Sequence, residues 1–141
     1  MPASSRPDDG PLVELPRHEC LALLRGQSLG RVAYTDHALP AITPVNYALD
    51  GDTIVFRTAL GSRLAEGTRD AVVAFEVDQA DASTHEGWSV VVIGVASEVS
   101  RASETMRAIE LALTPWAGGD RNRFVRITPT FVTGRRLTGA A

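Results

Sequence analysis

Residues 51–64, Gly-Asp-Thr-Ile-Val-Phe-Arg-Thr-Ala-Leu-Gly-Ser-Arg-Leu, combine a hairpin turn, a half-buried strand and the start of a helix. The opening glycine follows an aspartate, a pair that favours a tight hairpin turn. Arg57 and Thr58 end the expected strand, while Ser62 and Arg63 begin the expected helix. Two guanidinium groups, two hydroxyls and helix N-terminal amides at one place would suit a phosphate monoester. The alternative is a pair of surface arginines beside a hairpin.

Outward from this stretch, short apolar runs alternate with turn residues. Strands are expected at 29–35, 41–49, 53–58, 71–77, 88–99, 124–128 and 131–137, and helices at 16–26, 62–70 and 103–113. Short turns between most successive strands imply antiparallel pairing. A sheet of so many short strands most simply avoids unpaired edge strands by closing into a barrel. We therefore predict a mainly β (α+β) fold, a six- or seven-stranded antiparallel barrel with about three flanking helices.

Two of these strands carry unusual features. Pro44 interrupts the strand 41–49 and cannot donate a hydrogen bond to a sheet, so an edge, a bulge or a position facing a ligand is expected. The run 88–96 is almost continuously apolar, which indicates burial on both faces, and Gly94 within it suggests a bend or a bulge. Because a small barrel leaves such an apolar strand face exposed, a second copy of the chain is expected to cover it. The segment 78–87 is polar and is expected to be a turn-like loop.

Composition limits the class of protein. The 141 residues are 44% hydrophobic and 22% charged, which predicts a single domain over 13–141 after a flexible tail at 1–12. A net charge of -3 and a pI near 5.6 argue against a nucleic-acid partner. All 14 basic residues are arginine, so neither a lysine Schiff base nor a Walker-type lysine is possible. No run reaches membrane-spanning length and no signal peptide is visible, so we expect a cytoplasmic protein without a membrane partner.

Residues for metal, nucleophilic or acid–base chemistry are scarce. Cys20 is the single cysteine, which excludes an intrachain disulfide, and its leucine-rich surroundings indicate a buried residue. His18, His37 and His85 lie at a helix start or in loops, and their spacing matches no metal-binding motif. We therefore predict no metal site, and the sequence identifies no catalytic residue.

Several short motifs follow one another along the chain. They are Thr43-Pro44-Val45-Asn46-Tyr47, the residues 56–63, the residues 73–78, the residues 87–96, Arg126-Ile127-Thr128-Pro129 and Thr133-Gly134-Arg135, which together cover most of 15–138. In this order they resemble the split-barrel flavoproteins related to pyridoxamine 5'-phosphate oxidase. The resemblance favours the small actinobacterial-type branch, which also holds nitroimidazole-resistance-like proteins.

This resemblance implies a split β-barrel that forms a homodimer, with FMN bound at the subunit interface. It would place the phosphate and the flavin ring on three groups of residues. These are Arg57, Thr58, Ser62, Arg63 and the adjoining Leu64 for the phosphate, Thr43, Pro44, Val45 and Asn46 along the flavin ring, and Trp88 and Ser89 from the long strand of the partner subunit.

The chain also departs from the family pattern. Leu64 stands where the oxidases of vitamin B6 phosphate carry a second basic residue, and the lysine that they use for substrate phosphate is missing. Oxidation of pyridoxamine phosphate is therefore not expected. The leading hypothesis is an FMN-dependent oxidoreductase that passes hydride from a reduced nicotinamide to an unidentified small substrate. The alternatives are an F420-dependent reductase, whose acidic cofactor tail would use the C-terminal arginines, a non-enzymatic module that binds or stores flavin or haem, and a structural scaffold.

Overall fold

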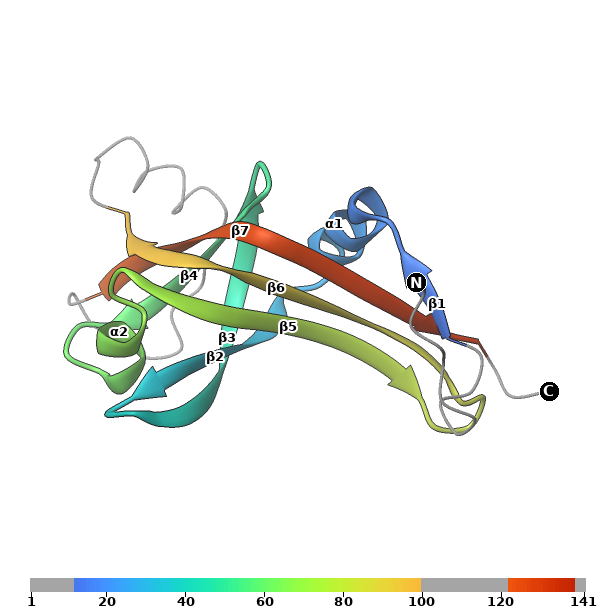
Figure 1. Cartoon of the computed structure of the whole chain (residues 1–141), viewed down its shortest axis with the longest axis horizontal. Helices are drawn as coiled ribbons and strands as arrows, with labels where there is room; N and C mark the ends of the chain where they lie inside the picture. The colour runs from blue at the N-terminus through green and yellow to red at the C-terminus, as the bar shows by residue number, and fades with distance from the viewer. Residues whose placement is uncertain (1–11, 100–121, 139–141) are drawn as a thin grey trace, which may run out of the picture.

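Seven strands and two helices make up residues 12–99 and 122–138, the part of the chain that this computed structural model describes (Figure 1). In chain order they are β1 (Leu12–Leu15), α1 (Arg17–Arg25), β2 (Leu29–Asp36), β3 (Leu39–Asp50), β4 (Thr53–Ala59), α2 (Arg63–Gly67), β5 (Ala71–Asp81), β6 (Glu86–Glu98) and β7 (Asn122–Leu137). The predicted helix at 103–113 and most of the predicted tail lie outside the described residues.

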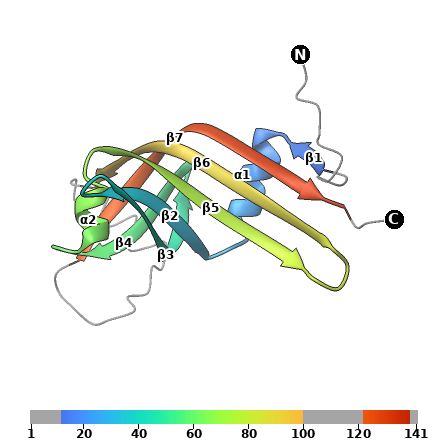
Figure 2. The ribbon, with the colours of Figure 1, turned by 60° about the horizontal axis from the view of Figure 1, so that its bottom comes forward.

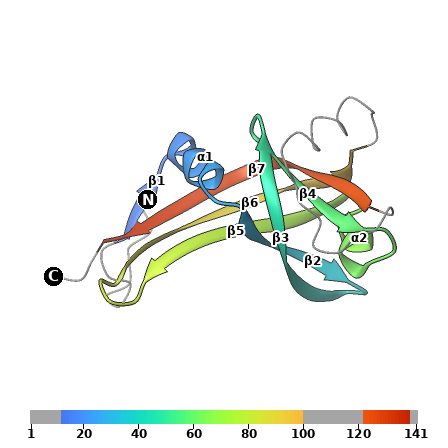
Figure 3. The ribbon, with the colours of Figure 1, turned by 180° about the vertical axis from the view of Figure 1, so that it is seen from behind.

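One antiparallel sheet curls back on itself. Its strand order is β1-β7-β4-β3-β2-β5-β6, and β6 also pairs with β7, so six strands close a ring to which β1 is added. Figure 2 shows β5, β6 and β7 running side by side along the molecule, with β2, β3 and β4 gathered toward one end. From behind, β3 crosses the long strands steeply, and α2 lies beside β2 and β4 (Figure 3). The predicted antiparallel split barrel is confirmed.

The strand β7 explains how the barrel is split. Along one side it pairs with β6 over nearly its whole length. Along the other side its first residues pair with β4 and its last residues pair with β1, so residues 128–133 have a neighbour on one side only. The barrel is therefore closed at the β4 end and open toward β1, where β5, β6 and β7 extend together beyond the ring. We call the outer part of β5 and β6 the β5–β6 arm.

The barrel interior is apolar. Alternate residues of every strand in the ring point inward and are almost completely buried, among them Val32, Tyr47, Phe56, Phe75, Val92 and Ile127. Helix α1 closes the open side with Cys20, Leu21 and Leu24, which confirms the predicted burial of the cysteine. Tyr47 packs edge-on against Phe75 and donates a hydrogen bond to the carbonyl of Leu24 at 2.5 Å. Burial raises the pKa of both the Tyr47 hydroxyl and the Cys20 thiol.

Four local predictions were wrong. The polar segment 78–87 is mostly strand, because β5 runs to Asp81 and β6 starts at Glu86; backbone pairing, and not apolar alternation, extends this arm. The two strands predicted at 124–137 are one, because Pro129 lies where β7 has one neighbour and where its register with β6 shifts. The short strand β1 was not among the strands predicted from the sequence. Helix α2 is shorter than predicted: Thr68 is its C-cap, and the left-handed backbone of Asp70, with a φ of 48°, follows.

The predicted irregularity at Gly94 is confirmed. The pairing of β6 with β7 changes register between Ile93 and Gly94. A Cβ atom at Gly94 would lie 2.2 Å from the carbonyl oxygen of Thr128, so the two backbones meet too closely for any side chain. The bulge therefore depends on glycine at this position.

Candidate functional site

Arg57 and Thr58 lie near the end of β4, and Ser62 and Arg63 lie at the start of α2; we call this place the β4–α2 corner. As successive residues of a strand, Arg57 and Thr58 project from opposite faces of β4. Thr58 Oγ1 and Ser62 Oγ lie 3.0 Å apart, within hydrogen-bond distance. Ser62 is the N-cap of α2, because its hydroxyl oxygen also accepts the backbone N–H of Ala65 at 3.0 Å. The structure thus brings the two hydroxyls together, as the sequence predicted.

The Thr58–Ser62 pair keeps one hydroxyl proton for a ligand. Two hydroxyl protons are present, and the mutual hydrogen bond uses one of them. The remaining O–H belongs to whichever residue accepts in that bond. Thr58 is 7% exposed, whereas Ser62 is half-buried, so solvent reaches the pair from the serine side. When Thr58 donates within the pair, the Ser62 O–H can donate a hydrogen bond to an anion at this side.

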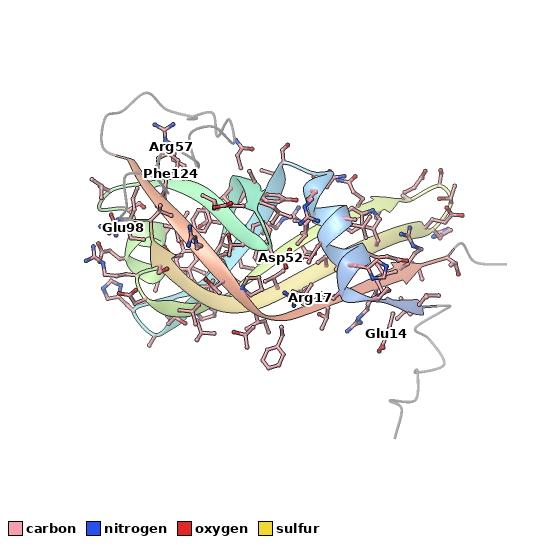
Figure 4. All side chains as sticks on the ribbon, turned by 90° about the horizontal axis from the view of Figure 1, so that it is seen from above. Glu14, Arg17, Asp52, Arg57, Glu98 and Phe124 are labelled. Atoms are coloured by element: carbon pink, nitrogen blue, oxygen red, sulfur yellow. The ribbon has the colours of Figure 1, made fainter. Side chains whose placement is uncertain are left out.

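The two arginines of the corner differ in how firmly they are held. Arg57 lies on the outer face of β4, with its guanidinium carbon 5.7 Å from the centre of the Phe124 ring. Figure 4 shows this pair at one end of the molecule, opposite Glu14 and Arg17. Arg63 is 84% exposed, and its Nε atom is 3.7 Å from Asp36 Oδ2. Such an exposed ion pair contributes little, so Arg63 can turn toward a ligand at little cost.

The other predicted contributions of this segment are smaller. Leu64 is 7% exposed and belongs to the apolar core, so only its backbone can face a ligand. Helix α2 spans five residues, which leaves a small dipole at its N-terminus. The recognition of an anion here therefore depends mainly on guanidinium and hydroxyl groups.

The segment from Thr43 to Asn46 lies on β3 and has one sheet neighbour. Over this segment β3 pairs with β2, and its pairing with β4 starts only at Tyr47. Alternate backbone N–H and C=O groups of the segment therefore point away from β2 and out of the sheet. Pro44 lies in this one-sided segment, so of the edge, bulge or ligand-facing positions expected from the sequence, the structure shows an edge.

Side chains of this segment alternate between the two faces of β3. Val45 is buried in the barrel, and Thr43 also points inward, where its Oγ1 lies 2.9 Å from the hydroxyl oxygen of Tyr34. Pro44 and Asn46 point outward. Val45 and Thr43 thus shape the strand from inside, and a ligand along the outer face would meet Pro44, Asn46 and the backbone.

Trp88 and Ser89 lie far from the β4–α2 corner in the same chain. They sit near the tip of the β5–β6 arm, at the opposite end from α2 (Figure 1). Trp88 is paired with Gln79 and Arg136, and Ser89 with Asp78 and Arg135. A cavity of about 530 Å³ opens beside them. Within one chain the structure does not unite these residues with the other predicted site residues.

Sequence reasoning missed a cluster of charges on the outer face of β2 and β5. Arg31 Nη1 lies 3.2 Å from Glu76 Oε1 and 3.6 Å from Asp78 Oδ2. Burial, and a hydrogen bond that the protonated Glu76 carboxyl donates to Asp78, raise the pKa of Glu76 to about 7, although Arg31 opposes the shift. The signal was the Glu-x-Asp spacing, which puts both carboxyls on one face of a strand. The sequence had instead placed Asp78 in a solvated loop.

Across 12–99 and 122–138, no three His, Cys, Asp or Glu side chains gather as they would around a metal ion. Neither described helix is long and apolar enough to cross a membrane.

Comparison with known proteins assigns the family. The family model described as pyridoxamine 5'-phosphate oxidase matches residues 16–136, which is most of the chain. The chain belongs to the pyridoxamine 5'-phosphate oxidase family. This family assignment confirms the resemblance found in the order of the sequence motifs.

Three relatives illustrate the assignment. The uncharacterized protein Rv0080 of Mycobacterium tuberculosis is 40% identical over 131 residues, covering 89% of this chain and 86% of the relative. The FAD binding protein of Mycobacterium smegmatis is 36% identical with a TM-score of 0.79, covering 89% of this chain and 99% of that protein. A candidate 5-nitroimidazole antibiotic resistance protein of Bacteroides thetaiotaomicron has a TM-score of 0.73 over 89% of each chain; at 12% identity it shares the fold alone. This member of the oxidase family therefore has flavin-binding relatives.

Proposed function

We propose that this protein is a flavin-dependent oxidoreductase that binds FMN at the β4–α2 corner of a homodimer. The hydrogen-bonded Thr58–Ser62 pair, flanked by Arg57 and Arg63, is the observation that carries the proposal. A phosphate monoester carries nearly two negative charges and accepts several hydrogen bonds, so it matches this set of donors. The substrate would be a small molecule, and the protein would work in the cytoplasm.

The residues of this chain would bind and orient the cofactor. The arginines and hydroxyls of the corner would hold the phosphate, and the one-sided segment 43–46 of β3 would offer backbone groups to the polar edge of the flavin ring. A bound flavin supplies the hydride chemistry itself, and protein groups mainly orient it. The sequence has no evident catalytic acid or base, which is compatible with a protein that mainly orients a reactive cofactor.

A homodimer is part of the proposal because an apolar row crosses the outer face of the barrel. The row consists of Ile42, Ala33, Ala74, Ile93 and Phe131, each paired with the next across neighbouring strands. Ile42, Ile93 and Phe131 are 68%, 40% and 63% exposed. Covering this outer apolar row with a second copy would remove it from water. The partner subunit could then supply Trp88 and Ser89, which lie far from the corner in one chain.

The identity of the nucleotide has a second candidate. The name of the Mycobacterium smegmatis relative specifies FAD, and that protein is 36% identical to this one. FAD would place its diphosphate where FMN places its monoester. F420 remains a further alternative, and a non-enzymatic flavin-binding or storage module is the alternative from another class.

The test is an absorption spectrum of the purified protein, followed by titration with FMN, FAD, F420 and haem. We expect saturable flavin binding that Arg57→Ala weakens about tenfold or more, because a charge-assisted hydrogen bond is lost. The control is Arg17→Ala, an exposed arginine of α1 at the other end of the molecule. Nicotinamide oxidation by the loaded protein would support the enzyme, and binding without turnover would favour the storage module. Failure to bind either flavin would refute the proposal.

A further inference from the structure

Arg123 lies beside the β4–α2 corner, although it is 60 or more residues away in sequence. In the ladder between β4 and β7 it is paired directly with Thr58. Side chains of such a pair project from the same face of the sheet, about 5 Å apart at their Cβ atoms. The next pair of the ladder, Arg57 with Phe124, projects from the opposite face. Arg123 is therefore a neighbour of the Thr58–Ser62 hydroxyl pair.

The Arg123 side chain is buried and incompletely satisfied. It is 10% exposed, which is low for an arginine. Its Nε atom is fully buried and makes no hydrogen bond with any described residue. Glu98 Oε1 lies 3.3 Å from that nitrogen as an ion pair, but in a direction that does not make a hydrogen bond. A guanidinium has five N–H donors, and within 12–99 and 122–138 Glu98 is the recorded partner of Arg123, so donors remain for another acceptor.

Glu98 is a loose partner for this arginine. It lies at the end of β6 and is 52% exposed, so water competes for its carboxylate. A buried charge that is paired in this way is costly unless a better acceptor completes its hydrogen bonds. Figure 4 places Glu98 at the same end of the molecule as Arg57 and Phe124. The acceptor is therefore expected at this end.

We propose that Arg123 is a further anion-binding residue of the β4–α2 corner, which donates to a phosphate group held by the Thr58–Ser62 hydroxyl pair. Glu98 forms an ion pair with the guanidinium of Arg123 when no anion is bound, and a bound anion replaces Glu98 as the partner of that guanidinium. This deepens the proposed function and rests on it for the flavin phosphate, but the anion site itself can be tested with inorganic phosphate. The family motifs include neither Arg123 nor Glu98.

The exchange predicts opposite effects for the two partners. Arg123→Gln removes the donor, so it should weaken FMN binding about tenfold or more and should not change the binding of riboflavin, which lacks the phosphate. Glu98→Gln removes the competing carboxylate, so it should tighten FMN binding. A purely structural ion pair would instead make both substitutions harmful. Arg17→Gln is the matched control at the far end of the molecule, and it should behave like the unchanged protein.

The experiment measures the affinities for FMN and riboflavin by flavin fluorescence, and the rise in melting temperature caused by inorganic phosphate. The proposal predicts that phosphate stabilises the unchanged protein and Glu98→Gln, but not Arg123→Gln. Equal responses of Arg123→Gln and the unchanged protein would overturn it, as would weaker FMN binding in Glu98→Gln. If Arg123→Gln fails to fold, the FMN affinity of Glu98→Gln alone tests the proposal. If phosphate raises the melting temperature only when Arg123 is present, but the protein binds no flavin, the flavin proposal is refuted and the anion-binding role of Arg123 is supported.

Discussion

The hydroxyl oxygen of Tyr34 lies 2.9 Å from Thr43 Oγ1, and the ring of the same tyrosine packs against Gly67 at the end of α2. One side chain of β2 therefore touches both parts of the candidate site. On one side is the β3 segment proposed for the flavin ring, and on the other is the helix that begins at the proposed phosphate position. A change in either part should reach the other through Tyr34.

The hydrogen bond between Tyr34 and Thr43 should contribute measurably to stability. Tyr34→Phe leaves the Thr43 hydroxyl without this partner, so we expect a loss of about 1 kcal/mol in the free energy of unfolding. Thr43→Val removes the other side of the bond. Chemical denaturation of both variants and of the double variant measures the coupling. Strictly additive losses would show that the two hydroxyls do not interact.

Gly67→Ala should disturb the site through the same tyrosine. A Cβ at Gly67 would lie 2.3 Å from Tyr34 Cδ2, so the ring must move, and we expect a cost of roughly 1–3 kcal/mol together with weaker FMN binding. Gly51→Ala is the control, because its surroundings are open and its φ of +61° makes only the backbone unfavourable. Melting temperatures and FMN titrations compare the two. Unchanged FMN affinity in Gly67→Ala would contradict the link.

Glu76 should make stability depend on pH. Its pKa rises from 4.5 to about 7, so the native state holds the proton more tightly than the unfolded chain does. The stabilisation is fully present below pH 4.5 and is lost as the pH rises through about 7. Glu76→Gln should flatten this fall, which we expect to be about 1 kcal/mol after allowance for solvent screening. Denaturation midpoints between pH 5 and 8 provide the measurement. An equal fall in stability in Glu76→Gln would show that Glu76 is not the cause of the pH dependence.

Ile93→Glu should prevent dimerisation. This residue lies in the outer apolar row between Ala74 and Phe131, so a carboxylate there would be buried without a partner in the proposed dimer. The matched control is Val13→Glu on β1, which is 49% exposed and outside the row. Light scattering of both variants and the unchanged protein gives the masses. A dimeric Ile93→Glu protein would place the interface elsewhere.

Local chemistry made the 51–64 stretch predictable. The turn glycine has a φ of 61°, the strand follows as β4, and Ser62 caps the helix through its own hydroxyl, all of which depend on neighbours in sequence. The helix boundary was not predictable in the same way. The left-handed backbone of Asp70, with a φ of 48°, turns the chain toward β5, and nothing in its side chain requires that conformation.

Long-range pairing limited the rest of the prediction. Arg123 was one of several C-terminal arginines in sequence, and only the register of β4 with β7 distinguishes it as the neighbour of Thr58. The separation of Trp88 from the β4–α2 corner likewise follows from the length of the β5–β6 arm, which the polar composition of 78–87 concealed. Registers of this kind depend on the whole ring of strands.

The arrangement of β7 has a consequence for the order of folding during synthesis. It borders β1, β4 and β6, and it is the last of the described strands to leave the ribosome. Until it emerges, the earlier strands can form hairpins, but both edges of the growing sheet stay open and the ring cannot close. The nascent chain would then expose unpaired edges that invite aggregation. Cooperative folding should therefore wait for the C-terminal strand, so that a stalled translation product would be cleared by chaperones or proteases.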